Sequence, residues 1–223
     1  MSTKQHLTAD EHARIAQAVR LAEARTSGEI FVVVAAQSGD YRTLPILWAA
    51  LATLVAGWLA MLWSSLANWW SGWNAAGIAP DTPAWSLVVV QALAFLVLSA
   101  LASVPALRIH LVPRAVRTAR AEARAREQFL AHNLHATEDR TGVLIFVSLA
   151  EHHAEIIADA GIHSRVPESF WAEIVDRLTA EIAAGRLAAG LVAAIEACGA
   201  ALAQNFPPKP ADLNELPDRV VEM

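Results

Sequence analysis

Two long stretches without a charged residue constrain this chain more than any other feature. No Asp, Glu, Lys or Arg occurs between Arg42 and Asp81, and none occurs between Asp81 and Arg108. Within these stretches, residues 45–64 and 85–104 are two apolar runs of about twenty residues. A helix of that length crosses roughly 30 Å of hydrocarbon at about 1.5 Å per residue. Core helices of soluble domains rarely continue this far without a charge, so we predict two membrane spans.

Tryptophan supports the same interpretation. Seven of the eight tryptophans lie between Trp48 and Trp85, and most of them fall near the ends of the two runs. Indole rings settle at the headgroup level of a bilayer. The connecting segment, residues 64–84, contains glycine and proline and is predicted to be an interfacial turn. We therefore predict that residues 45–107 form a transmembrane helical hairpin.

The distribution of arginine predicts the orientation of this hairpin. Arg42 precedes the first span and Arg108 follows the second, whereas the connecting loop has no Lys or Arg. Basic residues next to a span favour the cytoplasmic side. Both termini and the soluble part are therefore expected on the cytoplasmic side of a bacterial inner membrane, with Arg42 and Arg108 determining the topology. Neither span holds an ionisable residue, which favours an anchor over a transport path.

A basic stripe follows the hairpin, made of Arg114, Arg117, Arg120 and Arg124. One interpretation is docking on anionic lipid, because each basic residue near such a surface contributes about 1 kcal/mol. The other is a solvated helix face that only sets the topology. The two interpretations do not exclude one another, and the sequence leaves both open.

The remaining residues predict one discontinuous α/β domain, formed by residues 7–44 and 108–206. The strands at 29–36 and 143–150 are apolar on both faces, which predicts helices above and below the sheet. We expect a three-layer α/β/α sandwich whose small, mainly parallel sheet has about three to four strands. The other expected elements are a helix from the capping box at Thr8 to about Ala24, a helix at 114–135, an edge strand at 153–159 and helices at 167–183 and 187–205. The Pro-rich tail at 207–223 is expected to be extended or disordered, with a partner-binding peptide as the alternative.

Composition and motifs exclude several classes of function. The net charge of −5 argues against a general nucleic-acid binder, which is usually basic. The chain contains no P-loop, no H-E-x-x-H and no G-x-S-x-G motif. Its single cysteine, Cys198, stands among Gly and Ala on a predicted helix and is interpreted as a small packed side chain. No catalytic motif is recognisable, so enzymatic activity stays an open question at this point.

The densest group of candidate metal ligands begins with the run EHH at residues 151–153. Adjacent side chains of a strand point to opposite faces, so its two histidines cannot serve one site. The narrower candidate is a divalent-metal site formed by Asp159, His163 and Glu168, whose imidazole nitrogen and carboxylate oxygens suit Ca²⁺, Mg²⁺ or Zn²⁺. The alternative, which we favour, is a polar turn with solvated histidines.

Three stretches resemble the TPM domain family. They are LTADEHARIAQAVRLAEARTSGEIFVVV at 7–34, TGVLIFVSLAEHHAEIIADAGI at 141–162 and VPESFWAEIVDRL at 166–178. The family includes a plant thylakoid-lumen acid phosphatase, photosystem-repair proteins, a worm receptor modulator and bacterial membrane proteins. The resemblance covers about residues 7–44 and 114–206, and the inserted hairpin is similar to that of the bacterial membrane-anchored subset.

The resemblance is compatible with two different functions. Acidic residues near the second stretch are linked to divalent metal in some family members, and the positions here would be Asp159 and Glu168. Family members usually have Asp in place of Glu168 and a second glycine near Ala160. The leading interpretation is a non-enzymatic, membrane-anchored module that binds a protein partner or maintains a membrane complex. The alternative is a divalent-metal-dependent phosphatase resembling the plant member.

Overall fold

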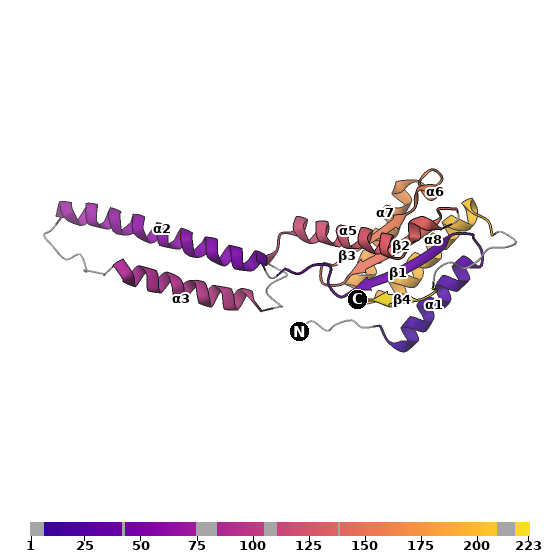
Figure 1. Cartoon of the computed structure of the whole chain (residues 1–223), viewed down its shortest axis with the longest axis horizontal. Coiled ribbons are helices and arrows are strands. Elements are labelled where there is room, and N and C mark those ends of the chain that lie inside the picture. The colour runs from indigo at the N-terminus through magenta and orange to yellow at the C-terminus, as the bar shows by residue number, and fades with distance from the viewer. Residues whose placement is uncertain (1–6, 42, 75–83, 105–110, 138, 209–216) are drawn as a thin grey trace. The chain divides into compact units, whose positions relative to one another are not determined.

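Figure 1 shows the computed structural model, which describes residues 7–41, 43–74, 84–104, 111–137, 139–208 and 217–223. The chain forms two compact units. We call Asp40–Pro113 the hairpin unit, and Ser2–Gly39 together with Arg114–Met223 the α/β unit. The α/β unit is therefore built from two separate parts of the sequence.

The α/β unit contains a four-stranded sheet in its described part, with the strand order β3-β2-β1-β4. Strand β1 (Glu29–Ala35) pairs in parallel with β2 (Gly142–Ser148) on one side and with β4 (Val220–Glu222) on the other. Strand β3 (His153–Ala158) pairs antiparallel with β2 and forms an edge. The mainly parallel sheet predicted from the sequence is confirmed.

Helices cover both faces of this sheet (Figure 1). On one face, α1 (Ala9–Glu23), α7 (Glu168–Ala183) and α8 (Leu187–Asn205) share a core with inward residues of β1 and β2. On the other face, α5 (Arg114–Ala131) and the short 3₁₀ helix η1 (Leu134–Ala136) pack on Phe31 and Val33. Every residue of β1 and β2 is buried, as expected for strands with helices on both sides.

Local sequence signals account for the boundaries of these elements. At the start of α1, the Glu11 N–H donates to Thr8 Oγ1 at 3.3 Å and the Thr8 N–H donates to Glu11 Oε2 at 2.8 Å. This reciprocal pair is the predicted capping box. Helix α5 ends at Ala131, four residues earlier than expected from the pattern at 114–135, because Asn133 adopts a left-handed backbone (φ 55°) that no α-helix contains.

The last residues of the tail, which was expected to be extended or disordered, join the sheet. Residues Val220–Glu222 form β4, which adds a fourth strand beside β1. The carboxyl end of this strand is held in place by the next residue, because the Met223 N–H donates to Val34 O at 3.0 Å and the Ala36 N–H donates to Met223 O at 2.7 Å. The chain therefore returns to the sheet after its Pro-rich stretch.

The hairpin unit contains two apolar helices that pack on one another, α2 (Thr43–Asn74) and α3 (Ala84–Ala102). The side chain of Gln91 on α3 crosses to α2, where its Nε2 donates to Thr53 O at 3.0 Å. It lies directly over Gly57, where an added Cβ would stand 1.9 Å from Gln91 Nε2. A glycine at this position is what lets the amide reach the backbone of α2.

The predicted interfacial turn at 64–84 is wrong for its first part, because α2 continues to Asn74. Ser64 and Ser65 do not end the helix, since each hydroxyl donates to the Met61 carbonyl within the same helix, at 2.8 and 3.0 Å. The rest of the connection, residues 75–83, lies outside the described residues, as do Arg42 and Arg108.

Two described helices are long and apolar enough to cross a membrane, α2 over Thr43–Leu66 and α8. Burial separates them, because 56% of the α8 window is buried within the protein and only 11% of the α2 window. We therefore regard α8 as a core helix of the α/β unit. Helix α3 contributes a shorter apolar stretch, Val88–Ala102.

Three carboxylates meet where α1 ends and β1 begins. Glu23 Oε1 accepts a hydrogen bond from the Ile30 N–H at 2.9 Å and so ties the two elements together. Burial, with repulsion from Glu29 and Asp218, raises the pKa of Glu23 from 4.5 to about 8, although the Ile30 N–H acts in the opposite direction. This contact joins α1, β1 and the segment that leads into β4.

Because the pKa of Glu23 is raised on folding, the folded protein holds this proton more tightly than the unfolded chain. The stabilising contribution is complete below pH 4.5 and is lost as the pH rises toward about 8. We expect Glu23→Gln to keep the Ile30 contact and to remove this loss. The free energy of unfolding should exceed that of the wild type by a few kcal/mol at pH 8, since one pKa unit corresponds to about 1.4 kcal/mol.

Native-state hydrogen exchange of the β1 amides at pH 5 and pH 8 measures this difference. The exposed Glu196→Gln serves as the control and should show no pH-dependent change. A Glu23→Gln variant that gains the same stability at both pH values would contradict the assignment.

Candidate functional site

The carboxyl ends of β1 and β2 lie side by side, since Ala35 pairs with Ser148 at the last position of their ladder. In open α/β sheets, ligands bind outside the carboxyl ends of the parallel strands. The segments that follow these strands carry Ser38 and Glu151, so the carboxyl ends of β1 and β2 form a candidate ligand site.

A hydrogen-bonded chain of side chains occupies this edge. Ser38 Oγ donates to Ser148 Oγ at 2.6 Å, and Ser148 Oγ in turn donates to Glu151 Oε2. The Ser38 N–H also donates to Glu151 Oε1 at 3.0 Å. Ser148 and Glu151 are buried, whereas Ser38 is half-buried. The arrangement connects a hydroxyl near the surface to a buried carboxylate, and it also closes the loop after β1 onto the loop after β2.

A second polar group lies on the face of β3 that α5 covers. His153 and Glu155 alternate along β3 and pair with Ser148 and Phe146 of β2, which places them on the side of the core that contains Phe146. His153 Nε2 and Glu155 Oε2 are 3.7 Å apart. Neither atom has a hydrogen-bond partner among the described residues, and the same holds for the buried Nε of Arg117 on α5.

The three residues of the predicted metal site lie at three different helix ends. Asp159 caps the short helix α6 (Ala160–His163), where its Oδ1 accepts the Ala160 N–H at 2.6 Å, and its buried Oδ2 has no hydrogen-bond partner among the described residues. His163 ends α6 and Glu168 begins α7, and both are exposed. Within the described part of the chain, no three His, Cys, Asp or Glu side chains come together as metal ligands.

Strand length explains why the acidic and histidine residues at 151–168 do not gather. His153 begins β3 beside Ser148, whereas the Asp159 N–H donates to Gly142 O at 2.9 Å, at the opposite end of β2. Six residues of strand cover about 20 Å at roughly 3.3 Å each. Glu151 and Asp159 therefore lie at opposite ends of the β2–β3 ladder. The turn between β2 and β3 carries His152, which is exposed with a left-handed backbone.

Some arginines of α5 form ion pairs with carboxylates of the same helix. Arg124 Nη1 lies 2.6 Å from Glu127 Oε2, and the neighbouring Arg126 lies 3.6 Å from Glu122. Arg114, in the first turn, is exposed. The two arginines of the second half, Arg124 and Arg126, are therefore paired with carboxylates of the same helix.

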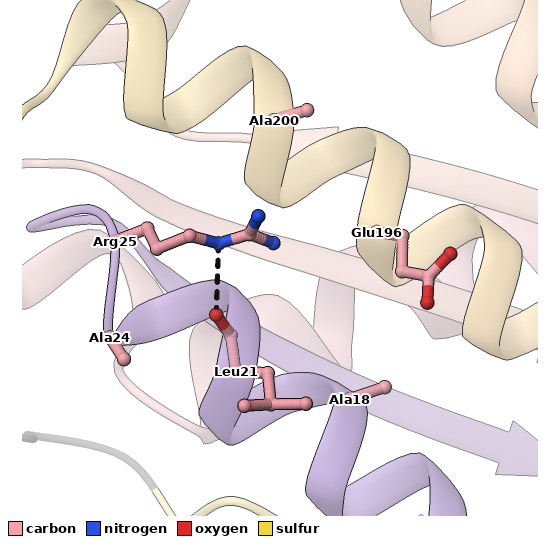
Figure 2. A pocket seen from close by; sticks show the side chains of 6 residues that line it. All are labelled: Ala18, Leu21, Ala24, Arg25, Glu196 and Ala200. Atoms are coloured by element: carbon pink, nitrogen blue, oxygen red, sulfur yellow. Dashed lines mark hydrogen bonds between the residues drawn. The ribbon is translucent and has the colours of Figure 1, made fainter.

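A hollow of about 530 Å³ opens between α1 and α8 (Figure 2). Leu21 is 59% exposed beside it, and the Arg25 Nε donates to Leu21 O at 3.1 Å. The Arg25 side chain extends from the end of α1 toward α8, as Figure 2 shows. The lining residues are Ala18, Leu21, Ala24, Arg25, Glu196 and Ala200.

Neither the hollow nor the serine chain could be found from the sequence. The hollow depends on the close approach of α1 and α8, where a Cβ on Gly199 would stand 2.6 Å from Ala22 Cβ. Ser38 and Ser148 are separated by the whole hairpin in the sequence, and single serines carry no motif. Of the residues in these two features, only Glu151 is among the candidate metal ligands named from the sequence.

Comparison with known proteins gives one family and one solved structure. Residues 103–201 match the family model described as the TPM domain. The BA42 protein from the psychrophilic bacterium Bizionia argentinensis, solved by NMR, has a similar fold, with a TM-score of 0.57 and 23% identity over 100% of both chains. No curated protein matches this chain. Residues 103–201 are therefore similar to the TPM domain, and the resemblance expected from the sequence is confirmed over this range.

Proposed function

We propose that this chain is an integral membrane protein that holds its TPM domain on the cytoplasmic side and acts by binding a protein partner at the membrane. The observation that carries the proposal is the exposure of the hairpin unit. Large apolar side chains along α2 are accessible, among them Leu54 at 65%, Trp58 at 70% and Met61 at 65%. Apolar surface costs about 25 cal/mol per Å² in water, and a bilayer removes that cost.

The hairpin unit divides the sequence of the α/β unit but leaves its sheet intact. The hairpin unit enters after β1 and ends before α5, and β1 still pairs with β2 over seven residues. An insertion placed in a crossover connection needs only to return the chain to the sheet. This arrangement supports a tether for an intact domain, and the arginines on both flanks support a cytoplasmic location.

The hollow between α1 and α8 is our candidate for the partner surface. Its lining is mainly alanine and leucine, with Arg25 and Glu196 contributing one positive and one negative charge. Small side chains leave room for a bulky apolar residue of another protein, and flanking charges orient it. We propose that the occupant is an amphipathic segment of a membrane-complex subunit with an apolar anchor residue and both charges.

A second candidate function rests on Asp159. Its Oδ2 is buried without a hydrogen-bond donor among the described residues, which is a position where a divalent cation would compensate the charge. The exposed Glu168 is the other residue that the family resemblance implies. This observation keeps a metal-dependent phosphatase as the alternative to the binding module.

Topology reporters test the anchor. Fusions at residue 2 and residue 223 should both report the cytoplasm, and a fusion at Gly77 should report the opposite side, because arginine flanks the hairpin and is absent from its loop. Alkaline extraction should leave the full chain in the membrane fraction. A C-terminal fusion reporting the far side would overturn the proposed orientation.

A photoreactive amino acid at Leu21 tests the partner surface. We expect one defined protein adduct in native membranes, and we expect its loss when Ala200→Trp fills the hollow. Leu130 on α5 is the matched control, because it is 58% exposed and lies away from α1 and α8. Equal adducts from Leu21 and Leu130, or an adduct that persists in the Ala200→Trp background, would contradict this surface.

Assays with a generic phosphate ester separate the two candidate functions. With Mg²⁺, Ca²⁺, Mn²⁺ or Zn²⁺ added, we expect the purified protein to show no more turnover than its Asp159→Ala variant. Glu173→Ala, an exposed change on α7, controls for loss of charge. Metal-dependent turnover that both Asp159→Ala and Glu168→Ala abolish would favour the phosphatase instead.

A further inference from the structure

We propose that the C-terminal strand β4 is a releasable edge of the sheet, which stays docked on β1 while the Glu23 carboxyl is protonated and detaches when that carboxyl ionises beside Asp218. The proposal concerns the α/β unit alone and does not depend on membrane insertion of the hairpin unit. Its consequence is a pH-dependent opening of the β1 edge, and an exposed strand edge is the kind of surface to which extended peptides add.

The pairing that holds β4 in the sheet is short. Strand β4 pairs with β1 over three residues, from Val32 beside Val220 to Val34 beside Glu222, whereas β2 pairs with β1 over seven. Two further backbone hydrogen bonds, both made by Met223, extend this ladder by one residue. Elements with few contacts open locally at a lower free energy than the core of a domain, so β4 can detach while the β1–β2 ladder stays paired.

Helix α1 holds the residues of the tail at two places. Near the beginning of α1, Glu222 Oε1 accepts the Leu7 N–H at 3.1 Å and lies 3.1 Å from His12 Nε2. At the other end of the helix, the Glu23 carboxyl forms a hydrogen bond with Asp218, two positions before β4 begins. Strand β4 is therefore fixed to α1 on both sides, by two different pairs of titratable groups.

The contact between Glu23 and Asp218 needs a proton, because an ionised carboxylate has no donor. The other groups that act on Glu23 belong to β1. The Ile30 N–H donates to it at 2.9 Å, and the carboxylate of Glu29 repels its charge, as that of Asp218 does. Among the described residues, no basic side chain forms an ion pair with Glu23. Ionisation of Glu23 therefore places two negative charges together at the point where the chain enters β4.

The sign of the pH dependence follows from this environment. Burial, with repulsion from Glu29 and Asp218, raises the pKa of Glu23 to about 8 in the docked state. Once β4 has detached, Asp218 no longer acts on this carboxyl, so its pKa is lower in the released state. The contribution of the proton to docking is complete below the pKa of the released state and is lost as the pH rises toward about 8. The loss amounts to at most about tenfold per pH unit.

A distance between two spin labels measures the release in the full chain, kept in detergent micelles. The labels are placed on Met223→Cys at the end of the tail and on Ala13→Cys at the exposed side of α1. The native Cys198 stays unlabelled, because it is buried and burial raises the pKa of its thiol to about 12. We expect one narrow distance distribution at pH 6 and a second, broad one at pH 9, with the ratio of released to docked molecules rising about tenfold or more.

A second pair of labels controls for unfolding. Ala13→Cys combined with Asp176→Cys, at an exposed position of α7, should give the same distance at both pH values. A change in this distance at pH 9 would show that the Glu23 proton holds the whole α/β unit together, and it would overturn the release of β4 alone.

Two neutral variants identify the groups that control the release. Glu23→Gln keeps an acceptor for the Ile30 N–H and supplies a donor for Asp218, so β4 should stay docked at both pH values. Asp218→Asn removes the repulsion and supplies a donor for the ionised Glu23, so it should also reduce the pH dependence. Asp176→Asn, an exposed change on α7, is the matched control and should respond to pH as the wild type does.

A single docked distance in the wild type at pH 9 would overturn the proposal. A release at pH 9 that is as large in both Glu23→Gln and Asp218→Asn as in the wild type would also overturn it. Either result would leave the proposed membrane anchor untouched, because the readout lies entirely within the α/β unit.

Discussion

Seven residues of β1 pair in parallel with seven residues of β2, from Glu29 beside Gly142 to Ala35 beside Ser148, and the rest of the α/β unit is arranged around this ladder. The two strands are far apart in the sequence, so pairing them closes a long loop. The entropy of closure grows only with the logarithm of loop length. The hairpin unit can therefore occupy this connection at little cost to the sheet, provided that its own apolar surface is removed from water.

The same pairing creates the features that bear on function. Because β1 and β2 end together, Ser38, Ser148 and Glu151 form a hydrogen-bonded chain at one edge. The α/β unit passes to the hairpin unit after Gly39 and resumes at Arg114, so Ser38 and the first turn of α5 adjoin the hairpin unit in the sequence. The hollow between α1 and α8 belongs instead to the helical layer on the other face of the sheet.

Some elements of this fold could be predicted from the sequence and others could not. The strands at β1 and β2 and the capping box at Thr8 were predicted because burial on both faces and reciprocal capping leave local patterns. Strand β4 was missed because Val220–Glu222 is too short to form alone and exists only through its pairing with β1. The end of α2 was misplaced because Ser64 and Ser65 bond within the helix, where their residue type suggested a turn.

By itself the sequence determined the class of domain and the presence of an apolar hairpin, because periodicity, charge-free length and local capping are properties of neighbouring residues. Tertiary structure alone decided which side chains meet. It separated Glu151 from Asp159, since β3 stands between them, and it brought Ser38 to Ser148 across the hairpin. It also paired Arg124 with Glu127 and Arg126 with Glu122 on α5. Contacts between distant residues depend on the paths of the strands and helices, and no local pattern encodes them.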